Sequence, residues 1–218
     1  MTLDDFTASA EDRSRFFWWL AEWFLSPPNA DQLASLVNPD MAQPPLDAMD
    51  SAWLALSNAA PDLAMTSLDE IGAEFTRLFS GISEGKGPPP PFESVWREDR
   101  LIGESTVAVL EAYTRAGFSD IDPDAGPQDH VSVELKFIAM LALREAEAWR
   151  ADDSTGAHQR LLQQRDFLRV HLSTWAPRWA DAVMQQTNLP LFAALAGLLK
   201  AGLEQATQEL TELTQQAD

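Results

Sequence analysis

Apolar residues recur at helical spacing along almost the whole chain, and no segment shows the strict alternation of a half-buried strand. The first strong pattern opens near Ser9, where Asp12 completes a capping box, and stops before Pro27. It is apolar almost all round, which predicts a central helix. Its core residues are expected to be Phe16, Phe17, Trp18, Trp19, Leu20, Trp23 and Phe24. Replacing Trp18 or Trp23 should therefore destabilise the fold.

The rest of the pattern predicts roughly eight further helices and one all-α domain spanning residues 1–218. Ser67 is expected to cap a helix that Gly81 ends, and Gly117 is expected to end another. The expected ranges are 31–37, 46–59, 68–80, 103–116, 129–152, 157–175, 177–186 and 190–216. The segment 117–128 is rich in proline and aspartate, so we expect it to act as a hinge between two helical halves.

Four consecutive prolines, Pro88–Pro91, come directly before an apolar and aromatic segment that ends at Trp96. We call residues 88–96 the proline arm. Proline fixes φ near about −65° and lacks a backbone donor, so the prolines can join neither a helix interior nor a sheet. The arm is either a recognition element or a strap packed across the core. In the first case we expect Val95 and Trp96 to be anchored inside, while Phe92 and Glu93 face a groove.

The charge balance is strongly acidic. The 218 residues include 34 Asp and Glu against 15 Lys and Arg, a net charge of −19, and no Lys or Arg lies between Arg15 and Arg77. Such a surface repels phosphate groups, which argues against nucleic-acid and anionic-membrane partners, and it attracts a basic partner. Solubility or adaptation to salt would explain the same charge, so charge alone selects no function.

Other features of the sequence favour a cytoplasmic protein. No cysteine is present, which excludes a disulfide framework and fits a reducing compartment. The apolar runs Phe16–Leu25 and Leu189–Leu203 are shorter or more interrupted than the roughly 18–20 residues of a membrane span. The first residues lack the apolar core of a signal peptide. We therefore expect no stable membrane insertion.

No constellation of catalytic residues is visible. The sequence lacks GxxxxGK[ST], HExxH, GxSxG and GxGxxG. His130, His158 and His171 are spread without the spacing of metal ligands. Asp129 is expected to cap a helix, with His130 exposed in its first turn, and a pairing of His130 with Glu134 would supply only two metal ligands. We therefore expect no enzyme, no metal and no cofactor.

Several segments together resemble a known family. The pattern EFTRLFSG…PPPPFESVW…GEST, followed by PQDH at the start of a long helix, is similar to the TorD/DmsD family of redox-enzyme maturation chaperones. The segments FLRVHLSTWAPRWADAV (167–183) and LPLFAALAGLLKAGL (189–203) resemble the C-terminal helices of the same family. The resemblance covers residues 74–203.

The resemblance implies an all-helical cytoplasmic chaperone. Members bind the twin-arginine signal peptide of a molybdopterin-containing oxidoreductase, or its apo catalytic subunit, and hold that enzyme for cofactor insertion before export. The groove would lie between the end of the 68–80 helix, the proline arm and the start of the 129–152 helix, with Asp129 and Glu93 meeting the paired arginines. The expected peptide-binding residues are Phe75, Leu78, Phe79, Pro90, Pro91, Phe92, Glu93, Ser94, Val95, Trp96, Asp129 and His130.

The client and the assembly state stay open. Phe75 and Phe92 stand where some relatives have tryptophan, and Glu93 stands where some have glycine, which bears on the choice of client. We expect a monomer or a domain-swapped dimer. His130 would make binding sensitive to pH, since an unperturbed histidine has a pKa near about 6.5. The alternative functions are an assembly chaperone for a non-exported molybdoenzyme subunit, a small helical nucleotide-hydrolysing enzyme, and a plain helical adaptor.

Overall fold

The structure is a computed structural model that describes residues 2–37, 50–63, 65–81, 87–119 and 121–216. Over these residues it contains α-helices and one short 3-10 helix, which confirms the all-α fold class. The helices are α1 (Leu3–Leu25), α2 (Ala30–Val37), α3 (Asp50–Leu63), α4 (Leu68–Phe79), α5 (Glu93–Glu98), α6 (Glu104–Arg115), η2 (Pro123–Ala125), α7 (Val131–Arg150), α8 (Ser154–Val170), α9 (Leu172–Gln186) and α10 (Pro190–Gln216). Residues 46–49 of an expected helix lie outside this described part of the chain.

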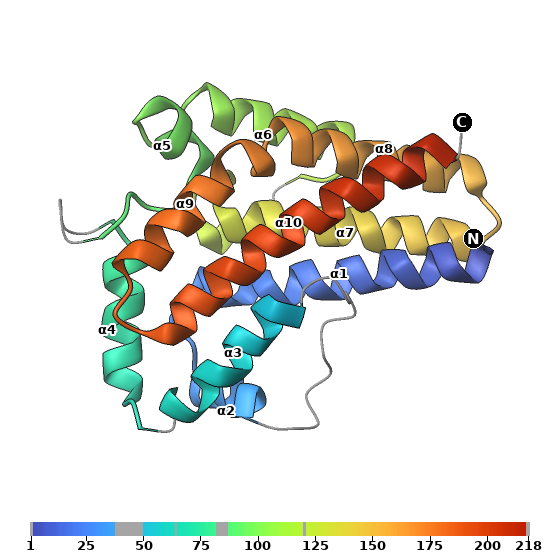
Figure 1. Ribbon diagram of the computed structural model, residues 1–218. Helices are drawn as coiled ribbons and strands as arrows, with labels where there is room; N and C mark the ends of the chain where they lie inside the picture. Colours follow the sequence, from blue (N-terminus) through green and yellow to red (C-terminus); the bar gives the residue numbers. More distant parts are fainter. Residues whose placement is uncertain (1, 38–49, 64, 82–86, 120, 217–218) are drawn as a thin grey trace.

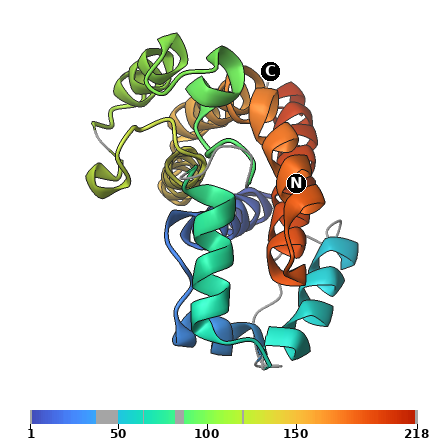
Figure 2. The ribbon, with the colours of Figure 1, turned by 90° about the vertical axis from the view of Figure 1, so that its left-hand side faces the viewer.

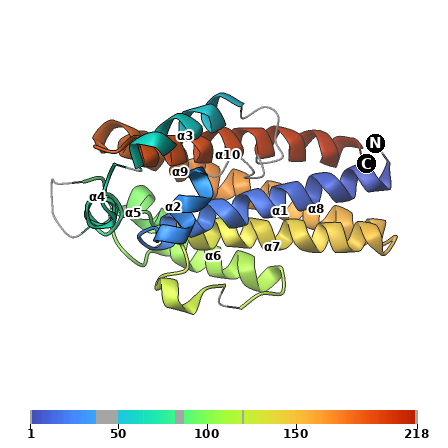
Figure 3. The ribbon, with the colours of Figure 1, turned by 90° about the horizontal axis from the view of Figure 1, so that it is seen from below.

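The long helices form a bundle with the two chain ends together at one side (Figure 1). α1 and α7 lie side by side and antiparallel, and α10 runs along the same bundle (Figure 3). α4 stands across the opposite end, where α1 finishes and α7 and α10 begin (Figure 2). The start of α7, the end of α1 and the end of α4 therefore meet far from the termini.

Aromatic residues fill the core where α1, α4, α9 and α10 converge. The ring of Phe24 lies 5.1 Å from that of Trp179, and the ring of Phe79 lies 5.4 Å from that of Phe192, centroid to centroid. Trp23 is buried as expected. The expectation that Trp18 is a core residue is wrong, because its side chain is 44% exposed and lies against the Lys136 ammonium. α1 thus keeps one face in solvent despite its apolar sequence.

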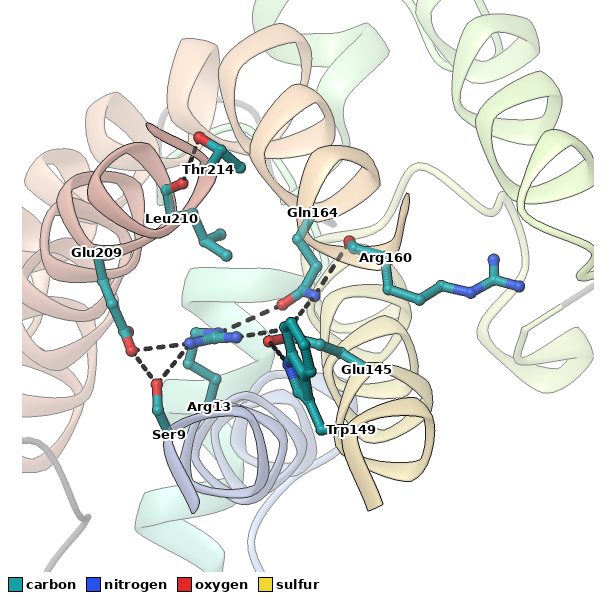
Figure 4. Close-up of polar contacts among 9 residues, drawn as sticks. All are labelled: Ser9, Arg13, Glu145, Trp149, Arg160, Gln164, Glu209, Leu210 and Thr214. Atoms are coloured by element: carbon teal, nitrogen blue, oxygen red, sulfur yellow. Dashed lines mark hydrogen bonds and ion pairs between the residues drawn. The ribbon is translucent and has the colours of Figure 1, made fainter. Parts of the chain in front are cut away.

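A buried arginine ties four helices together (Figure 4). The Arg13 guanidinium on α1 donates to Glu145 on α7 (2.6 Å), to Glu209 on α10 (2.8 Å) and to Gln164 on α8 (3.3 Å). Both Arg13 and Glu145 are fully buried, and the Trp149 indole donates to the other Glu145 oxygen. The network satisfies a buried charge within the bundle and fixes the register of these helices.

Helix ends follow local capping signals in some places and not in others. α4 begins with the Ser67 capping box, as the sequence predicts. α1 begins earlier than expected, because Thr2 and Asp5 form the capping box and Ser9 instead bonds Glu209. α3 continues past Pro61, which was expected to lie beyond its end. The break near Trp175 was also misplaced: α8 ends at Val170, and Pro177 lies inside α9.

No helix among the described residues is long and apolar enough to cross a membrane.

Candidate binding site

A pocket of about 400 Å³ opens at the end of the bundle that α4 covers. It is lined by the end of α1, the second half of α4, the proline arm and the approach to α7. Its residues are Phe24, Leu25, Ser26, Phe75, Phe79, Ser80, Phe92, Ala125 and His130. We call it the aromatic pocket. Its lining is mostly apolar with a few polar groups, which suits the apolar side chains of a ligand.

α4 presents two phenylalanines on one face. Phe75 and Phe79 are one helical turn apart, and their rings contact edge to face with centroids 4.6 Å apart. Phe79 also packs on Trp179 of α9 and on Phe24 of α1, so its ring is held from behind. Both phenylalanines are largely buried, which leaves only their edges to the pocket. The pocket wall is therefore preformed.

Glu74 holds α4 in place against the loop between α9 and α10. Its carboxylate accepts hydrogen bonds from the Asn188 backbone (2.6 Å) and from the Arg77 guanidinium (2.7 Å). Burial alone would raise the pKa of Glu74, but the hydrogen bonds from Arg77 and Asn188 lower it to about 2. Arg77 also donates to the Gln186 carbonyl. α4 is thus fastened by a charged clamp next to Phe75.

Two glycines let the chain turn back from α4 into the proline arm. Gly81 has a φ of +61°, and a Cβ there would lie 2.9 Å from the Pro90 ring. At Gly87 a Cβ would lie 2.0 Å from the carbonyl oxygen of Arg77. A side chain at Gly87 would push the arm off α4, because the obstacle is backbone. The arm is consequently packed directly against the end of α4.

The proline arm pairs with the segment that leads into α7. Phe92 and His130 form an isolated antiparallel bridge, in which Glu93 N donates to Asp129 O and Val131 N donates to Pro91 O, both at 2.9 Å. The Phe92 and His130 rings contact edge to face, 4.9 Å between centroids. The bridge thereby places two of the expected binding residues side by side in the aromatic pocket.

His130, not Asp129, caps α7. Its Nδ1 accepts a hydrogen bond from the Ser132 backbone N–H and lies 2.7 Å from the Ser132 hydroxyl oxygen. Burial lowers the pKa of His130 to about 4, so the ring is neutral at neutral pH. The expectation of an exposed His130 that titrates near its ordinary pKa is therefore wrong for the unliganded protein.

Asp129 caps the helix of the arm. Its Oδ2 accepts from the backbone N–H of Ser94 in the first turn of α5, at 2.9 Å. The Asp129 side chain is fully buried, and its Oδ1 has no hydrogen-bond partner among the described residues. Asp129 thus joins the arm to the start of α7.

Glu93 does not face the pocket, contrary to expectation. It begins α5, and the side chain turns inward, fully buried, to Arg97 on the same helix and to His171 (Nδ1 at 2.9 Å) between α8 and α9. The arm is extended only over its prolines, because α5 starts directly after Phe92. Glu93 is therefore paired inside the protein in the unliganded form.

The other expected binding residues surround the pocket without lining it. Leu78, Pro91 and Ser94 are buried behind it. Val95 and Trp96 are partly buried, and the Trp96 indole N–H donates to the Pro90 carbonyl. These residues pack the arm against the core as a strap, whereas Phe92 of the same arm forms part of the pocket wall.

Five pocket residues were missed by the site prediction: Phe24, Leu25, Ser26, Ser80 and Ala125. The first three close α1 just before Pro27, where a helix that ends in apolar residues leaves them at the rim. Ala125 lies in the acidic 117–128 segment, which was treated only as a linker. An apolar residue within an acidic loop was the available signal.

No group of three or more potential metal ligands is present among the described residues. The site consists of an apolar pocket with neutral His130 at its edge and buried carboxylates behind it. Such an arrangement suits recognition of an apolar segment with a nearby cation.

Comparison with known proteins gives concordant matches. A family model described as nitrate reductase delta subunit matches residues 43–181. The Tat proofreading chaperone DmsD of Salmonella typhi is 31% identical over 210 residues, covering 95% of this chain and 91% of that protein. The chaperone protein TorD of Vibrio cholerae strain O395 is 25% identical over 215 residues, covering 94% and 95%. A crystal structure of a putative redox enzyme maturation protein from Archaeoglobus fulgidus aligns with a TM-score of 0.49 at 20% identity, over 85% of this chain and 91% of that one.

Proposed function

The chain belongs to the TorD/DmsD family of redox-enzyme maturation chaperones, and we propose that its aromatic pocket binds the twin-arginine signal peptide of a molybdopterin-containing oxidoreductase. In this role the protein works in the cytoplasm and holds its client for cofactor insertion before export. The observation that carries the proposal is that Phe75, Phe79, Phe92 and His130, which come from separate segments of the sequence, line one pocket.

The apolar part of the leader would provide most of the binding free energy. Each leucine or phenylalanine side chain that becomes fully buried contributes about 1.5–3 kcal/mol. A pocket of about 400 Å³ holds only a few such side chains. Ordering a disordered leader offsets part of this gain, so a micromolar Kd is the expected range.

The paired arginines of the leader would lie near the start of α7. Asp129 directly precedes the pocket residue His130, and its Oδ1 has no hydrogen-bond partner within the described part of the chain. Because Asp129 and Glu93 are fully buried, an arginine reaches them only if the arm shifts. The apolar contact with Phe92 and the ionic contact with Asp129 are therefore coupled through the arm.

The test is calorimetric titration with twin-arginine leader peptides, each beside a control peptide with Gln-Gln in place of Arg-Arg. We expect Phe92→Ala to weaken binding of the preferred leader about tenfold or more, because it removes an aromatic pocket wall. Trp18→Ala is the matched control, since Trp18 is a partly exposed aromatic residue that lies outside the pocket. Equal affinities for wild type and Phe92→Ala would exclude the aromatic pocket as the leader site.

A second client class is the apo catalytic subunit of a molybdoenzyme bound without an export leader; we keep it because the matching family model is described as a nitrate reductase delta subunit, which names no signal peptide. The Gln-Gln peptides and a pull-down with the subunit separate the two. Leader binding that tolerates Gln-Gln, together with capture of a leaderless subunit through the same pocket, would favour the second class.

A further inference from the structure

Three buried carboxyl groups lie together next to the aromatic pocket. Glu93 follows the pocket residue Phe92, Asp129 precedes His130, and Glu134 is one helical turn further along α7. All three side chains are fully buried. The proposed function assigns a role to the first two only, and nothing so far accounts for Glu134.

The hydrogen-bond donors around the cluster are unequally shared. The Glu93 carboxyl group pairs with Arg97 and His171, and the Asp129 carboxyl group accepts a hydrogen bond from the Ser94 backbone N–H. Neither oxygen of Glu134 accepts a well-formed hydrogen bond from the described residues. A carboxylate buried in this state costs several kcal/mol, which protonation avoids.

The groups that interact with Glu134 come from several elements. They are Glu93 on α5, Tyr113 on α6, Asp129 before α7 and Trp175 on α9. Arg97 and His171 contact the neighbouring Glu93. Burial raises the pKa of Glu134 well above its usual value, and the charges of Glu93 and Asp129 raise it further. The Trp175 indole favours the ionised form but does not offset these effects. Tyr113 does not donate a hydrogen bond to Glu134, since its hydroxyl donates to the Gln128 carbonyl.

A protonated Glu134 would have a suitable partner. Its O–H lies within reach of the Glu93 carboxyl group, and two carboxyl groups can form a hydrogen bond only if one of them carries a proton. Such a bond links Glu93, the first residue of α5, to Glu134 in the first turn of α7, close in sequence to the Phe92–His130 bridge. It therefore fastens the proline arm at the point where a ligand would have to move it.

We propose that Glu134 holds a proton in the unliganded protein, shares it with Glu93, and releases it when a guanidinium group binds at Asp129. The Glu134 O–H bond breaks, the proton passes to solvent, and the guanidinium replaces it as the positive charge of the cluster. The net charge of the cluster is unchanged by this exchange. The release step rests on the proposed leader binding, whereas the proton on Glu134 does not.

The proton is tested on the free protein by infrared spectroscopy at neutral pH. We expect a carbonyl band of one buried protonated carboxyl group that is absent from Glu134→Gln, whose amide mimics the protonated acid. Glu145→Gln is the matched control, because Glu145 lies on the same helix and is equally buried but ion-paired with Arg13. Glu147→Gln, at an exposed position of α7, serves if Glu145→Gln does not fold. A wild-type spectrum without this band would overturn the proposal.

Thermal unfolding gives a second readout of the same proton. The folded protein keeps the Glu134 proton at pH values where the unfolded chain, with a pKa of about 4.5, has lost it. Folding therefore takes up a proton, and this contribution to stability falls as pH rises above about 4.5 and through the raised pKa. As the pH is raised from about 5 to about 8, the Tm of Glu134→Gln should therefore rise relative to the Tm of wild type. A constant difference would contradict a proton on Glu134.

The release step is tested by titrating the preferred twin-arginine leader in buffers with different heats of ionisation. Wild type should release about one proton on binding, so its affinity should approach a tenfold rise per pH unit, whereas Glu134→Gln should bind without release. Leader binding with no proton release would overturn the exchange and leave the proposed function standing. Failure of every leader to bind would overturn the proposed function. The infrared band would still show whether Glu134 is protonated in the free protein.

Discussion

Buried polar residues show how the same chemical group takes different roles on one helix. Glu145 and Glu134 both lie fully buried on α7, three turns apart. Glu145 pairs with Arg13 and accepts hydrogen bonds from Gln164 and Trp149, whereas no cation is paired with Glu134 in the described part of the chain. The first stabilises the bundle as a charge, and the second is stable there only with a proton.

The Arg13 network should be the most sensitive polar point of the core. We expect Arg13→Met to lower the free energy of unfolding by about 3–5 kcal/mol, because it leaves Glu145 without its buried counterion. Urea unfolding measures the loss. Arg15→Met, two positions along the same helix, is the control: its side chain is 66% exposed, so a loss below about 1 kcal/mol is expected.

A double variant checks the cause of that loss. Arg13→Met combined with Glu145→Gln removes both buried charges and should recover part of the stability. If the double variant is less stable than the sum of the single changes predicts, the Arg13 effect comes from lost packing and not from an unpaired carboxylate.

Single-residue roles could be predicted only where the sequence context is local. Phe75, Phe79 and Phe92 were predicted as binding residues and do line the pocket, because helical spacing and the arm motif fix their positions. Glu93 was expected to face the groove, but its orientation depends on His171, far along the chain. Trp18 could not be placed from an all-apolar pattern, because that pattern does not say which face is covered.

Helix starts and stops show the same limit at the scale of elements. The Ser67 capping box predicted the start of α4 because cap and first turn are neighbours in sequence. The break between α8 and α9 carries no glycine or proline, and His171 there is held by Glu93 of the proline arm. A tertiary contact coincides with the end of this helix, so local signals could not locate it.

The position of the proline arm depends on a backbone contact at Gly87. We expect Gly87→Ala to displace the arm from α4 and weaken leader binding about tenfold, because the added Cβ would lie 2.0 Å from the carbonyl oxygen of Arg77. Gly72→Ala is the matched control on α4. A Cβ at Gly72 meets nothing within 4 Å, so this change should stabilise the protein slightly and leave binding unaltered. Unchanged binding by Gly87→Ala would show that the arm is not part of the site.

Charge is distributed unevenly over the whole molecule. The net charge of −19 is spread along the chain, but α1, α2 and α4 together carry nine acids against three arginines, whereas α8 carries three arginines against one acid. The aromatic pocket lies at the α4 end of the bundle, opposite the chain termini (Figure 1). In the proposed function, a basic leader would therefore be attracted toward the molecule over a distance and then held by short-range contacts in the pocket.

This separation predicts that the surface acids act on the association rate of a leader, whereas the buried contact with Asp129 acts on its dissociation rate. The on-rate for a twin-arginine leader should fall on the order of tenfold when salt is raised from about 20 mM to about 300 mM, as screening shortens the range of attraction. Stopped-flow fluorescence of a labelled leader measures it. The Gln-Gln leader should show a shallower salt dependence because it carries less charge.

Position can be separated from net charge with two variants of equal charge. Glu22→Gln, Asp31→Asn and Asp69→Asn together remove three exposed acids from the α4 end, whereas Asp4→Asn, Asp152→Asn and Glu212→Gln remove three from the end with the termini. The first triple variant should lower the on-rate more than the second, because steering depends on the potential near the pocket. Equal on-rates in the two would mean that only total charge matters, and the leader would then have no preferred direction of approach.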